Sequence, residues 1–387
     1  MQTYPHLPSG LTILIISFKK KFYNIQLTTY ILTEGSRSCH WKRCHFCYLN
    51  SGYHFRTKSI NAIVDEILYM IEKYNVFDFG FLDNDLIAGD IDRFNCLLDK
   101  LIEIKQRYPI FKIGSSEVIT KNLPFKTIKK MAIAGFHNIQ IGYESPSNTL
   151  LKKIDKKNTF ASNLFFIKYA HIFQMNFNGA NIITNLLEET EEDIYEATEN
   201  LDFLRFVLAS GSLRHNIITL CVNSSSKYFP KVKNEIHTWE KAPIKNFLIK
   251  NYIQEKDLVH IIEFANVIAH PFWSNFRKIE NHYITHKHEY RLFNTNGNIL
   301  YKEFCQNVLT KEYLFPNDSI EKIILIETNQ AVLSLQELLE IFQSRLNKPI
   351  EENKLKSAIE DLTRKRLVYH SGDFSEILSV INMNLAI

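Results

Sequence analysis

Apolar residues recur at helical spacing immediately after Ser59, and a short apolar run lies on either side of that segment. A helix is predicted from an N-cap at Ser59 to about Tyr74, because its apolar side chains share one face. These side chains are Ile60, Ile63, Val64, Ile67, Leu68 and Ile71. The runs 27–32 and 76–82 have the length of buried strands. The segment 27–82 therefore predicts a strand, a helix and a second strand.

The same alternation continues along the next 140 or so residues. Helices are predicted over 90–108, 125–134, 149–154, 159–173 and 191–207, and strands over 111–115, 138–141, 176–183 and 213–222. Pro109 ends the first of these helices, and Gly135 is the expected C′ residue of the second. Strand and helix alternating about six times favour a parallel sheet with helices outside it. The predicted fold class is therefore α/β.

The pattern changes after about Phe229. Asn296-Gly297 predicts a hairpin turn between strands at 290–293 and 298–304. From Ser319 onward, helices at 335–345 and 353–366 precede strands at 367–371 and 377–381, which is typical of a winged-helix-like module. Trp239 and Trp273 either line a groove or pack in the interior. We predict four regions: an N-terminal segment (1–26), a core (27–228), a mixed extension (229–318) and a C-terminal winged-helix-like module (319–387).

Composition excludes some functional classes and leaves others open. The chain has 387 residues and a formal net charge of +4, too small to predict nucleic acid or a membrane surface as a partner. The apolar stretch from Leu11 to Phe18 is short and is followed by three lysines without a cleavage-site pattern, so it predicts neither a signal peptide nor a membrane span. A cytoplasmic location is expected.

Three cysteines, Cys39, Cys44 and Cys47, lie within nine residues of one another just after the first predicted strand. In a chain without a secretory signal, such crowding predicts a metal or cluster site rather than disulfides. Three thiolates leave a zinc ion one ligand short, whereas a cubane cluster held by three cysteines keeps one iron open. His40 and His45 keep a zinc site as the alternative. The other three cysteines, Cys96, Cys221 and Cys305, are expected to be buried.

The cysteine spacing, with Phe46 just before the last cysteine, resembles a spacing variant of the radical S-adenosylmethionine (SAM) motif. The segments C-Y-L-N-S-G (47–52) and F-R-T-K-S (55–59) resemble those of radical SAM enzymes that mature ribosomally made, post-translationally modified peptides. Several of those enzymes resemble cobalamin-dependent C-methyltransferases. The resemblance implies an open, partial (β/α)6 parallel barrel, a 4Fe–4S cluster on the three cysteines, SAM as a cofactor, and Phe46 beside them.

Polar residues at the predicted strand ends extend this resemblance. Asp83 and Asn84 resemble a D-N-x-L stretch near the amino acid end of SAM, and Glu117 follows the next strand, where the family places polar contacts. Gly142, Glu144 and Ser145 resemble a G-x-E-S segment that contacts SAM. Glycine permits close backbone approach, and a carboxylate accepts hydrogen bonds from ribose or amine groups. The alternatives are a helix-capping turn for Asp83-Asn84 and a solvent-facing side chain for Glu117.

The resemblance also implies partners. A precursor peptide is the expected substrate, and flavodoxin or ferredoxin the expected electron donor. Cobalamin-dependent members usually carry a large Rossmann-like cobalamin-binding domain before the cluster loop, and 38 residues precede Cys39 here. Cobalamin is therefore expected either from a separate protein or not at all. Two other hypotheses stay open: a radical SAM enzyme that acts on RNA through its C-terminal module, and a zinc-binding regulatory module.

Overall fold

The structure is a computed structural model of the chain. It describes residues 30–385 apart from 51–53, 178–179, 233–239, 242–263 and 266–269. The predicted N-terminal segment 1–26 and Trp239 lie outside the described residues.

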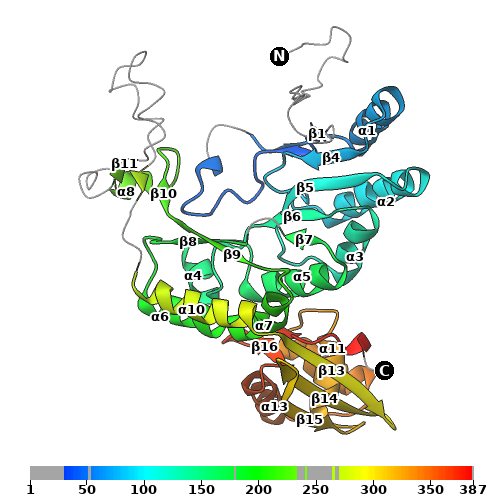
Figure 1. The fold of residues 1–387 in the computed structure, drawn as a ribbon, viewed down its shortest axis with the longest axis vertical. Coiled ribbons are helices and arrows are strands. Elements are labelled where there is room, and N and C mark those ends of the chain that lie inside the picture. Colours follow the sequence, from blue (N-terminus) through cyan, green and yellow to red (C-terminus); the bar gives the residue numbers. More distant parts are fainter. Residues whose placement is uncertain are drawn as a thin grey trace.

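Parallel strands form the centre of the fold (Figure 1). Five of them hydrogen-bond in chain order: β1 (Tyr30–Thr33), β4 (Asp78–Phe81), β5 (Lys112–Val118), β6 (Asn138–Ile141) and β7 (Asn176–Phe177). A second parallel pair, β8 (Ala180–Thr184) and β9 (His215–Thr219), continues the series, because Glu144 after β6 forms a parallel bridge to Ile182 in β8. The parallel α/β core predicted from the alternating pattern is confirmed.

Helices cover the outer face of these strands (Figure 1). They are α1 (Ile60–Tyr74), α2 (Ile91–Arg107), α3 (Phe125–Ile133), α4 (Asn148–Lys153), α5 (Phe160–Ile172), α6 (Glu191–Glu199) and α7 (Leu201–Ala209). The predicted cap of α1 is present, since Ser59 Oγ accepts a hydrogen bond from the Ala62 amide. Its apolar face, including Ile63 and Ile67, is buried in the same core as Phe79 of β4.

Several predicted elements end or break elsewhere. The strand predicted at 111–115 continues to Val118, so Glu117 lies inside β5 rather than after it. The strand predicted at 176–183 is divided between β7 and β8, and the helix predicted at 191–207 breaks at Asn200 into α6 and α7. The strand predicted at 213–222 is divided into β9 and β10 (Cys221–Val222). The expectation that Cys96, Cys221 and Cys305 are buried was wrong, because Cys96 and Cys221 are exposed and Cys305 is half-buried.

Short elements surround the cysteine loop. The antiparallel pair β2 (Ser36–Arg37) and β3 (Arg56–Thr57) lies at its two ends, and the 3-10 turn η1 (Tyr48–Asn50) follows Cys47. Further along the chain come α8 (Phe229–Val232), β11 (Glu240–Lys241), β12 (Phe264–Ala265) and α10 (Phe272–Thr285). Helix α10 contacts α6 and α7, and its Trp273 and Phe276 are buried in the main core, so Trp273 packs in the interior rather than lining a groove.

The C-terminal part has its own hydrophobic core. Its elements are β13 (His288–Thr295), β14 (Asn298–Cys305), β15 (Val308–Phe315), α11 (Ile320–Glu327), α12 (Leu335–Glu340), a π-turn η4 (Ile341–Arg345), α13 (Glu352–Arg364), β16 (Val368–His370), β17 (Ile377–Ser379) and η5 (Met383–Leu385). The predicted turn joins β13 to β14, with positive φ at Asn296 (53°) and Gly297 (85°). The sheet β13–β14–β15 shares its core with α11, α12 and α13, so the border predicted at 318/319 falls between elements that pack together. The division into four regions stays a prediction.

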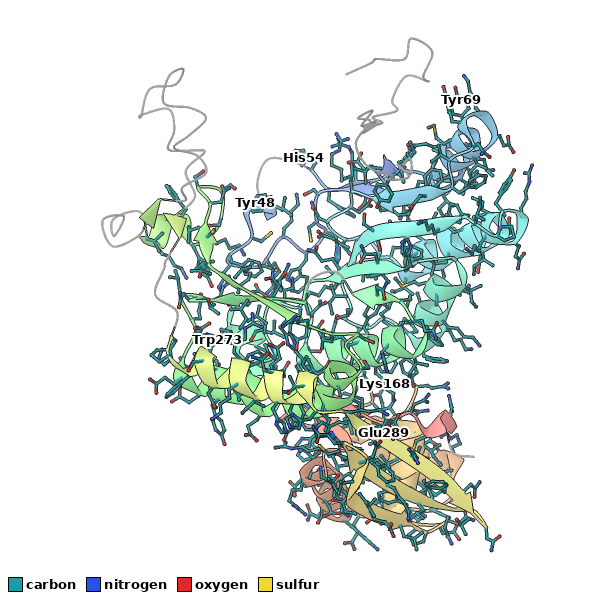
Figure 2. All side chains as sticks on the ribbon, viewed as in Figure 1. Tyr48, His54, Tyr69, Lys168, Trp273 and Glu289 are labelled. Carbon is teal, nitrogen blue, oxygen red and sulfur yellow. The ribbon has the colours of Figure 1, made fainter. Side chains whose placement is uncertain are left out.

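Buried polar side chains fix this C-terminal part to the parallel α/β core. Lys168 of α5 donates to the carbonyls of Asn329 and Ser379 at 3.0 and 2.9 Å, where α5 meets the C-terminal part (Figure 2). Arg205 of α7 forms a bidentate pair with Glu303 of β14, at 3.0 and 2.9 Å. Buried pairs of this kind hold one geometry, because either partner left alone would be a buried unpaired charge. Among the described residues, no helix has both the length and the apolar character needed to cross a membrane.

Candidate radical cluster site

The cysteine loop follows β1 and is held against the turn between α4 and α5. Trp41 Nε1 donates to the Asp155 carbonyl at 2.8 Å, and the His45 amide donates to the Ile154 carbonyl at 3.1 Å. Arg43 adds an ion pair with the Asp155 carboxylate at 2.9 Å. The loop is therefore fixed by one short turn that lies more than a hundred residues away in the chain.

The three cysteines lie partly buried in this loop, and none of the chain's six cysteines forms a disulfide. Burial raises the pKa of the Cys44 thiol to about 11; Lys156 opposes the rise, while Cys47, Glu144 and Cys39 add to it. Burial likewise raises the pKa of Cys47, against Lys156. The same neighbours act on both thiols, so the three sulfurs and the Lys156 ammonium share one region. A cationic metal centre in that region would favour the thiolate forms.

Lys156 provides the positive charge of this region. Its side chain is 11% exposed, and its Nζ lies 2.8 Å from Glu144 Oε1. Burial disfavours the ammonium, but the Glu144 carboxylate and then Cys44 outweigh burial and raise the pKa of Lys156, so the ammonium is charged at neutral pH. Glu144 itself has a left-handed backbone with φ of 54°, which directs its side chain toward Lys156 at the end of β6.

Two of the other predicted residues lie beside this pair. A Cβ placed on Gly142 would come within 2.4 Å of Lys156 Nζ, so a larger residue there would displace the end of the lysine side chain. Burial raises the pKa of Glu117, and the charge of Glu144 adds to the rise while Lys156 opposes it. The structure thus brings Glu117, Gly142 and Glu144 together around the Lys156 ammonium.

The remaining predicted residues have separate surroundings. Phe46 packs on the apolar cluster that includes Leu150 and Ile154, with Lys156 Nζ 5.7 Å from its ring centre. Ser145 is fully buried, and its hydroxyl accepts from the Ser147 amide at 3.0 Å, in the turn that begins α4. Asn84 is partly exposed between two buried aspartates.

Asp83 is 2% exposed at the end of β4. Its Oδ2 accepts from the Gly35 amide at 2.8 Å, which ties β4 to the end of β1. Burial raises the pKa of Asp83 to about 6, although hydrogen bonds from Gly35 and Ser36 oppose the rise. Asp83 is therefore a buried carboxyl at the carboxyl edge of the sheet, rather than the solvated capping turn that was its alternative reading.

Replacing Asp83 by asparagine should reduce the pH dependence of folding stability. The pKa of the carboxyl is near 3.8 in the unfolded chain and about 6 in the fold, so the fold binds more protons between these values. The free energy of unfolding should therefore fall as the pH rises from about 4 to about 6, and Asp83→Asn should remove this contribution. Urea unfolding of both proteins across that interval measures it. Equal slopes for the two proteins would show that Asp83 is not the source.

Four buried polar atoms at this edge have no hydrogen-bond partner among the described residues. They are Thr33 Oγ1, Ser38 Oγ, Asp83 Oδ1 and Ser116 Oγ. They come from β1, the cysteine loop, the end of β4, and β5. Buried polar groups are almost always paired, so a local group of unpaired ones indicates a bound polar ligand or water.

The described core matches a known family. Residues 33–201 match the sequence profile of the radical SAM superfamily. These residues form a radical SAM domain. The match begins at the end of β1 and includes the cysteine loop and the strands β4 to β8. The cofactors of this superfamily are a 4Fe–4S cluster and SAM.

Individual relatives cover only parts of the chain. An uncharacterized methyltransferase of Pyrococcus horikoshii is 29% identical over 184 residues, which are 45% of this chain and 38% of that protein. Among solved structures, the radical SAM methyltransferase TsrM of Kitasatospora setae is similar with a TM-score of 0.48 and 11% identity, covering 66% of this chain and 51% of TsrM. The cobalamin-dependent radical enzyme OxsB has a TM-score of 0.44 and 17% identity, covering 65% of this chain and 40% of OxsB. The chain thus spans between 38% and 51% of the length of these proteins.

Three cysteine thiols match the number of ligands that a 4Fe–4S cluster with one open iron needs, and both histidines of the loop contact other side chains. Among the residues that the structure describes, no three His, Cys, Asp or Glu side chains converge on one metal ion. His40, a zinc ligand in the alternative hypothesis, has Nε2 2.6 Å from Lys157 Nζ and Nδ1 3.0 Å from Asp85 Oδ2. His45 Nδ1 lies 2.9 Å from Glu188 Oε1. A cubane needs its three sulfurs spread around a larger object than a single ion, and it needs no histidine.

The sequence analysis did not identify the residues outside the cysteine loop that hold the loop in place. Lys156, Lys157 and Asp155 belong to a charged run after α4, which reads as a solvated turn. Glu188, after β8, contacts both His45 and the Tyr228 hydroxyl. The only signal in the sequence is that Lys156 closely follows the G-Y-E-S segment it contacts.

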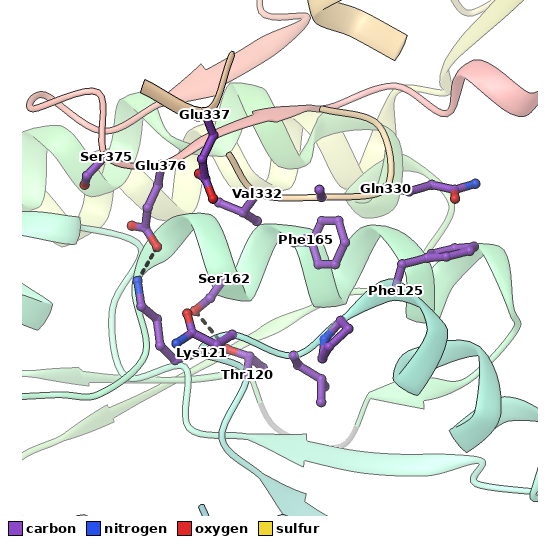
Figure 3. Close-up of a pocket in the computed structure, with 14 residues that line it drawn as sticks. Thr120, Lys121, Phe125, Ser162, Phe165, Gln330, Val332, Glu337, Ser375 and Glu376 are labelled. Carbon is purple, nitrogen blue, oxygen red and sulfur yellow. Dashed lines mark hydrogen bonds and ion pairs between the residues drawn. The ribbon is translucent and has the colours of Figure 1, made fainter. Parts of the chain in front are cut away.

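A cavity of about 420 Å³ lies between the radical SAM domain and the C-terminal part (Figure 3). Its walls are the loop after β5, one face of α5 and three C-terminal segments: Thr120, Lys121, Asn122, Leu123, Pro124, Phe125, Ser162, Phe165, Gln330, Ala331, Val332, Glu337, Ser375 and Glu376. Lys121 and Glu376 pair at one end, and Phe125 and Phe165 make the other end apolar. The Thr120 amide bonds to Asn158, which donates to the Gly142 carbonyl at 2.8 Å. Two hydrogen bonds through Asn158 thus connect one wall of the cavity to Gly142, which belongs to the segment predicted to contact SAM.

Proposed function

We propose that this chain is a radical SAM enzyme in which Cys39, Cys44 and Cys47 hold a 4Fe–4S cluster, and that it modifies a peptide. The observation that carries the proposal is the gathering of three partly buried thiols around the Lys156–Glu144 pair, at the carboxyl edge of a parallel barrel. Catalytic groups of such barrels lie at that edge.

Cys39, Cys44 and Cys47 would hold the 4Fe–4S cluster, which would supply the one electron needed to cleave SAM to methionine and a 5′-deoxyadenosyl radical. The protein's residues bind and orient the reactants. Asp83 Oδ1 and Glu117 are buried or half-buried acceptors for the ammonium of SAM, and Gly142 allows the backbone to approach closely. The positive charge of the Lys156 ammonium offsets the negative charges of Glu144 and of the cluster-binding thiolates.

The C-terminal part supports a peptide as substrate. It is fixed to the barrel by Lys168 and Arg205, and the cavity between the two parts has both a polar and an apolar end, as a peptide with mixed side chains requires. RNA is less well supported, because basic residues of and after α13 are already paired. Lys356 contacts Glu352, Lys365 contacts Asp361, and Arg366 contacts Asp202.

Methyl transfer is the reaction type that the named relative suggests. The matched protein of P. horikoshii is called a methyltransferase. We include C-methylation of the peptide in the proposal.

An electron paramagnetic resonance spectrum tests the proposal. The anaerobically reconstituted, dithionite-reduced protein should show a four-iron signal whose shape changes when SAM is added, because SAM binds at the open iron. A colourless protein that binds zinc and shows no such signal would contradict it. A four-iron signal that does not change when SAM is added would support the cluster but contradict binding of SAM at its open iron.

A further inference from the structure

The three-stranded sheet of the C-terminal part has one face in the core and one face outside it. The sheet lies at the end of the molecule away from the cysteine loop (Figure 1). Leu292, Ile299 and Tyr301 are buried on the inner face, in the core that α11, α12 and α13 share. Because successive side chains of a strand point to opposite faces, the residues between these positions lie on the other face.

Cross-strand partners on that other face form two rows. The first row is apolar and consists of Phe293, Leu300 and Leu314. Phe293 is 41% exposed and Leu314 is 58% exposed. The second row is charged and consists of Arg291, Lys302 and Glu312. We call these six residues the outer face. Adjoining exposed apolar side chains with charged residues beside them are typical of an interaction surface.

The charged row has opposite signs at its two ends. Arg291 of β13 is 59% exposed, and Glu312 of β15 is 47% exposed. Arg291 lies 2.8 Å from Glu289, which it shares with Lys287, and Glu312 lies 2.8 Å from Lys302. Both ends can accept a further partner, because a guanidinium has five N–H donors and a carboxylate has about four acceptor positions.

These two rows fit a second copy of the outer face under two-fold symmetry. β14 is the middle strand, so a two-fold axis along it places β13 of each copy over β15 of the other. Leu300 then faces its counterpart on the axis, and Phe293 faces Leu314. Arg291 of each copy faces Glu312 of the other. Lys302 also faces its counterpart, but the neighbouring Glu312 offsets its charge.

The charges exclude the other simple arrangement. A two-fold axis that crosses the strands places β13 over β13 and β15 over β15. Arg291 would then face Arg291, and Glu312 would face Glu312, which is unfavourable for like charges. The pattern of the outer face is therefore self-complementary in one orientation.

The size of the sheet sets the strength of such an association. Each strand has eight residues. With about 3.3 Å per residue and about 4.8 Å between strands, the face measures about 26 by 14 Å. Interfaces of this size are at the low end for protein complexes, so we expect a dimer that dissociates at micromolar concentration.

We propose that the outer faces of two copies of this chain pack together in a symmetric dimer, with Arg291 of each copy paired with Glu312 of the other. Sheets commonly pack face to face with their strands nearly aligned. The cysteine loop lies at the opposite end of the molecule, so it stays open in both copies (Figure 1). The inference does not depend on the proposed function, because no residue of the outer face belongs to the candidate radical cluster site.

Two opposite charge reversals test the arrangement. Arg291→Glu places glutamate against glutamate at both symmetric contacts, and Glu312→Arg places arginine against arginine. An equimolar mixture restores opposite charges at both contacts, because each variant supplies the charge that the other lacks. Lys100→Glu is the matched control, since Lys100 is 47% exposed on α2 and also pairs with one glutamate.

Sedimentation velocity of the cluster-free full chain measures the dissociation constant between about 1 and about 100 μM. A thiol reductant is present, because Cys96 and Cys221 are exposed. Each reversal should weaken the dimer at least about ten-fold, and less so at high salt. The mixture should recover the wild-type value, and Lys100→Glu should retain it. Leu314→Ser, which leaves every charge in place, should also weaken the dimer.

Three results would overturn the inference. The first is a wild-type protein that stays monomeric throughout the concentration range, which would leave the outer face to a different partner. The second is a dimer that survives both charge reversals and Leu314→Ser, because another surface would then hold it. The third is a mixture that does not recover although both variants have wild-type thermal unfolding midpoints, since Arg291 would then not face Glu312.

Discussion

Replacing Cys44 by alanine should abolish the four-iron signal of the reconstituted protein and its cleavage of SAM. A cubane cluster held by three thiolates already has one iron without a protein ligand. Removing Cys44 leaves a second iron without one, and the cluster is then lost. Burial raises the pKa of the Cys44 thiol to about 11, and its neighbours Lys156, Cys47, Glu144 and Cys39 also act on its ionisation. We expect iron and sulfide contents to fall to background, measured together with the spectrum at low temperature.

The matched control is Cys96→Ala on α2, where the thiol is exposed and outside the cysteine loop. It should retain wild-type iron, sulfide and signal. Thermal unfolding of the cluster-free proteins should give nearly equal midpoints for all three, which would show that Cys44→Ala still folds. A normal four-iron signal in Cys44→Ala would contradict the assignment of Cys44, and full zinc binding in its place would favour the regulatory module.

Local sequence patterns correctly predicted the elements whose formation depends mainly on residues close together in the chain. The cap at Ser59 and the apolar face of α1 lie in one continuous segment, and the structure has both. The strand predicted at 138–141 agrees with β6 at both ends. The Asn296-Gly297 turn was also predicted, because few other dipeptides accept positive φ at two successive positions.

Other boundaries depend on contacts between distant segments. β5 continues through polar Ser116 and Glu117 because its second half pairs with β6 after its first half pairs with β4. Periodicity cannot show such a change of partner, and tertiary pairing overrides the weak strand preference of serine and glutamate. The break at Asn200 is similar, since its side chain donates to the Pro146 carbonyl at 2.8 Å, far away in the chain.

The candidate site likewise contains some residues that the sequence could predict and others that it could not. Cysteine spacing alone pointed to the cluster loop, because its ligands must be close in the chain. Gly142 and Glu144 were identified through their resemblance to a known segment, and the structure adds that the end of the Lys156 side chain lies against Gly142. Lys156 itself could not be predicted, because a lysine in a charged run gives no sign that its side chain is buried.

Replacing Lys156 by methionine should make the reduction potential of the cluster more negative, on the order of 100 mV, and lower the iron retained after reconstitution. Methionine fills a similar volume but removes the ammonium that Glu144 contacts at 2.8 Å. Glu144 and Glu117 would then repel each other and the thiolates without a counter-ion, so adding an electron would cost more. Potentiometric titration followed by electron paramagnetic resonance measures the shift.

Two further variants separate charge from packing at this position. Lys156→Arg keeps the charge, so it should recover most of the wild-type potential if the ammonium acts electrostatically. Lys153→Met removes a lysine of the same segment that pairs with Asp193 at 2.7 Å, on α6. It should lower stability slightly and leave the potential unchanged, because its charge acts on a helix cap rather than on the thiols. A potential that is the same in Lys156→Met and in the wild type would show that the Lys156–Glu144 pair supports the loop without tuning the cluster.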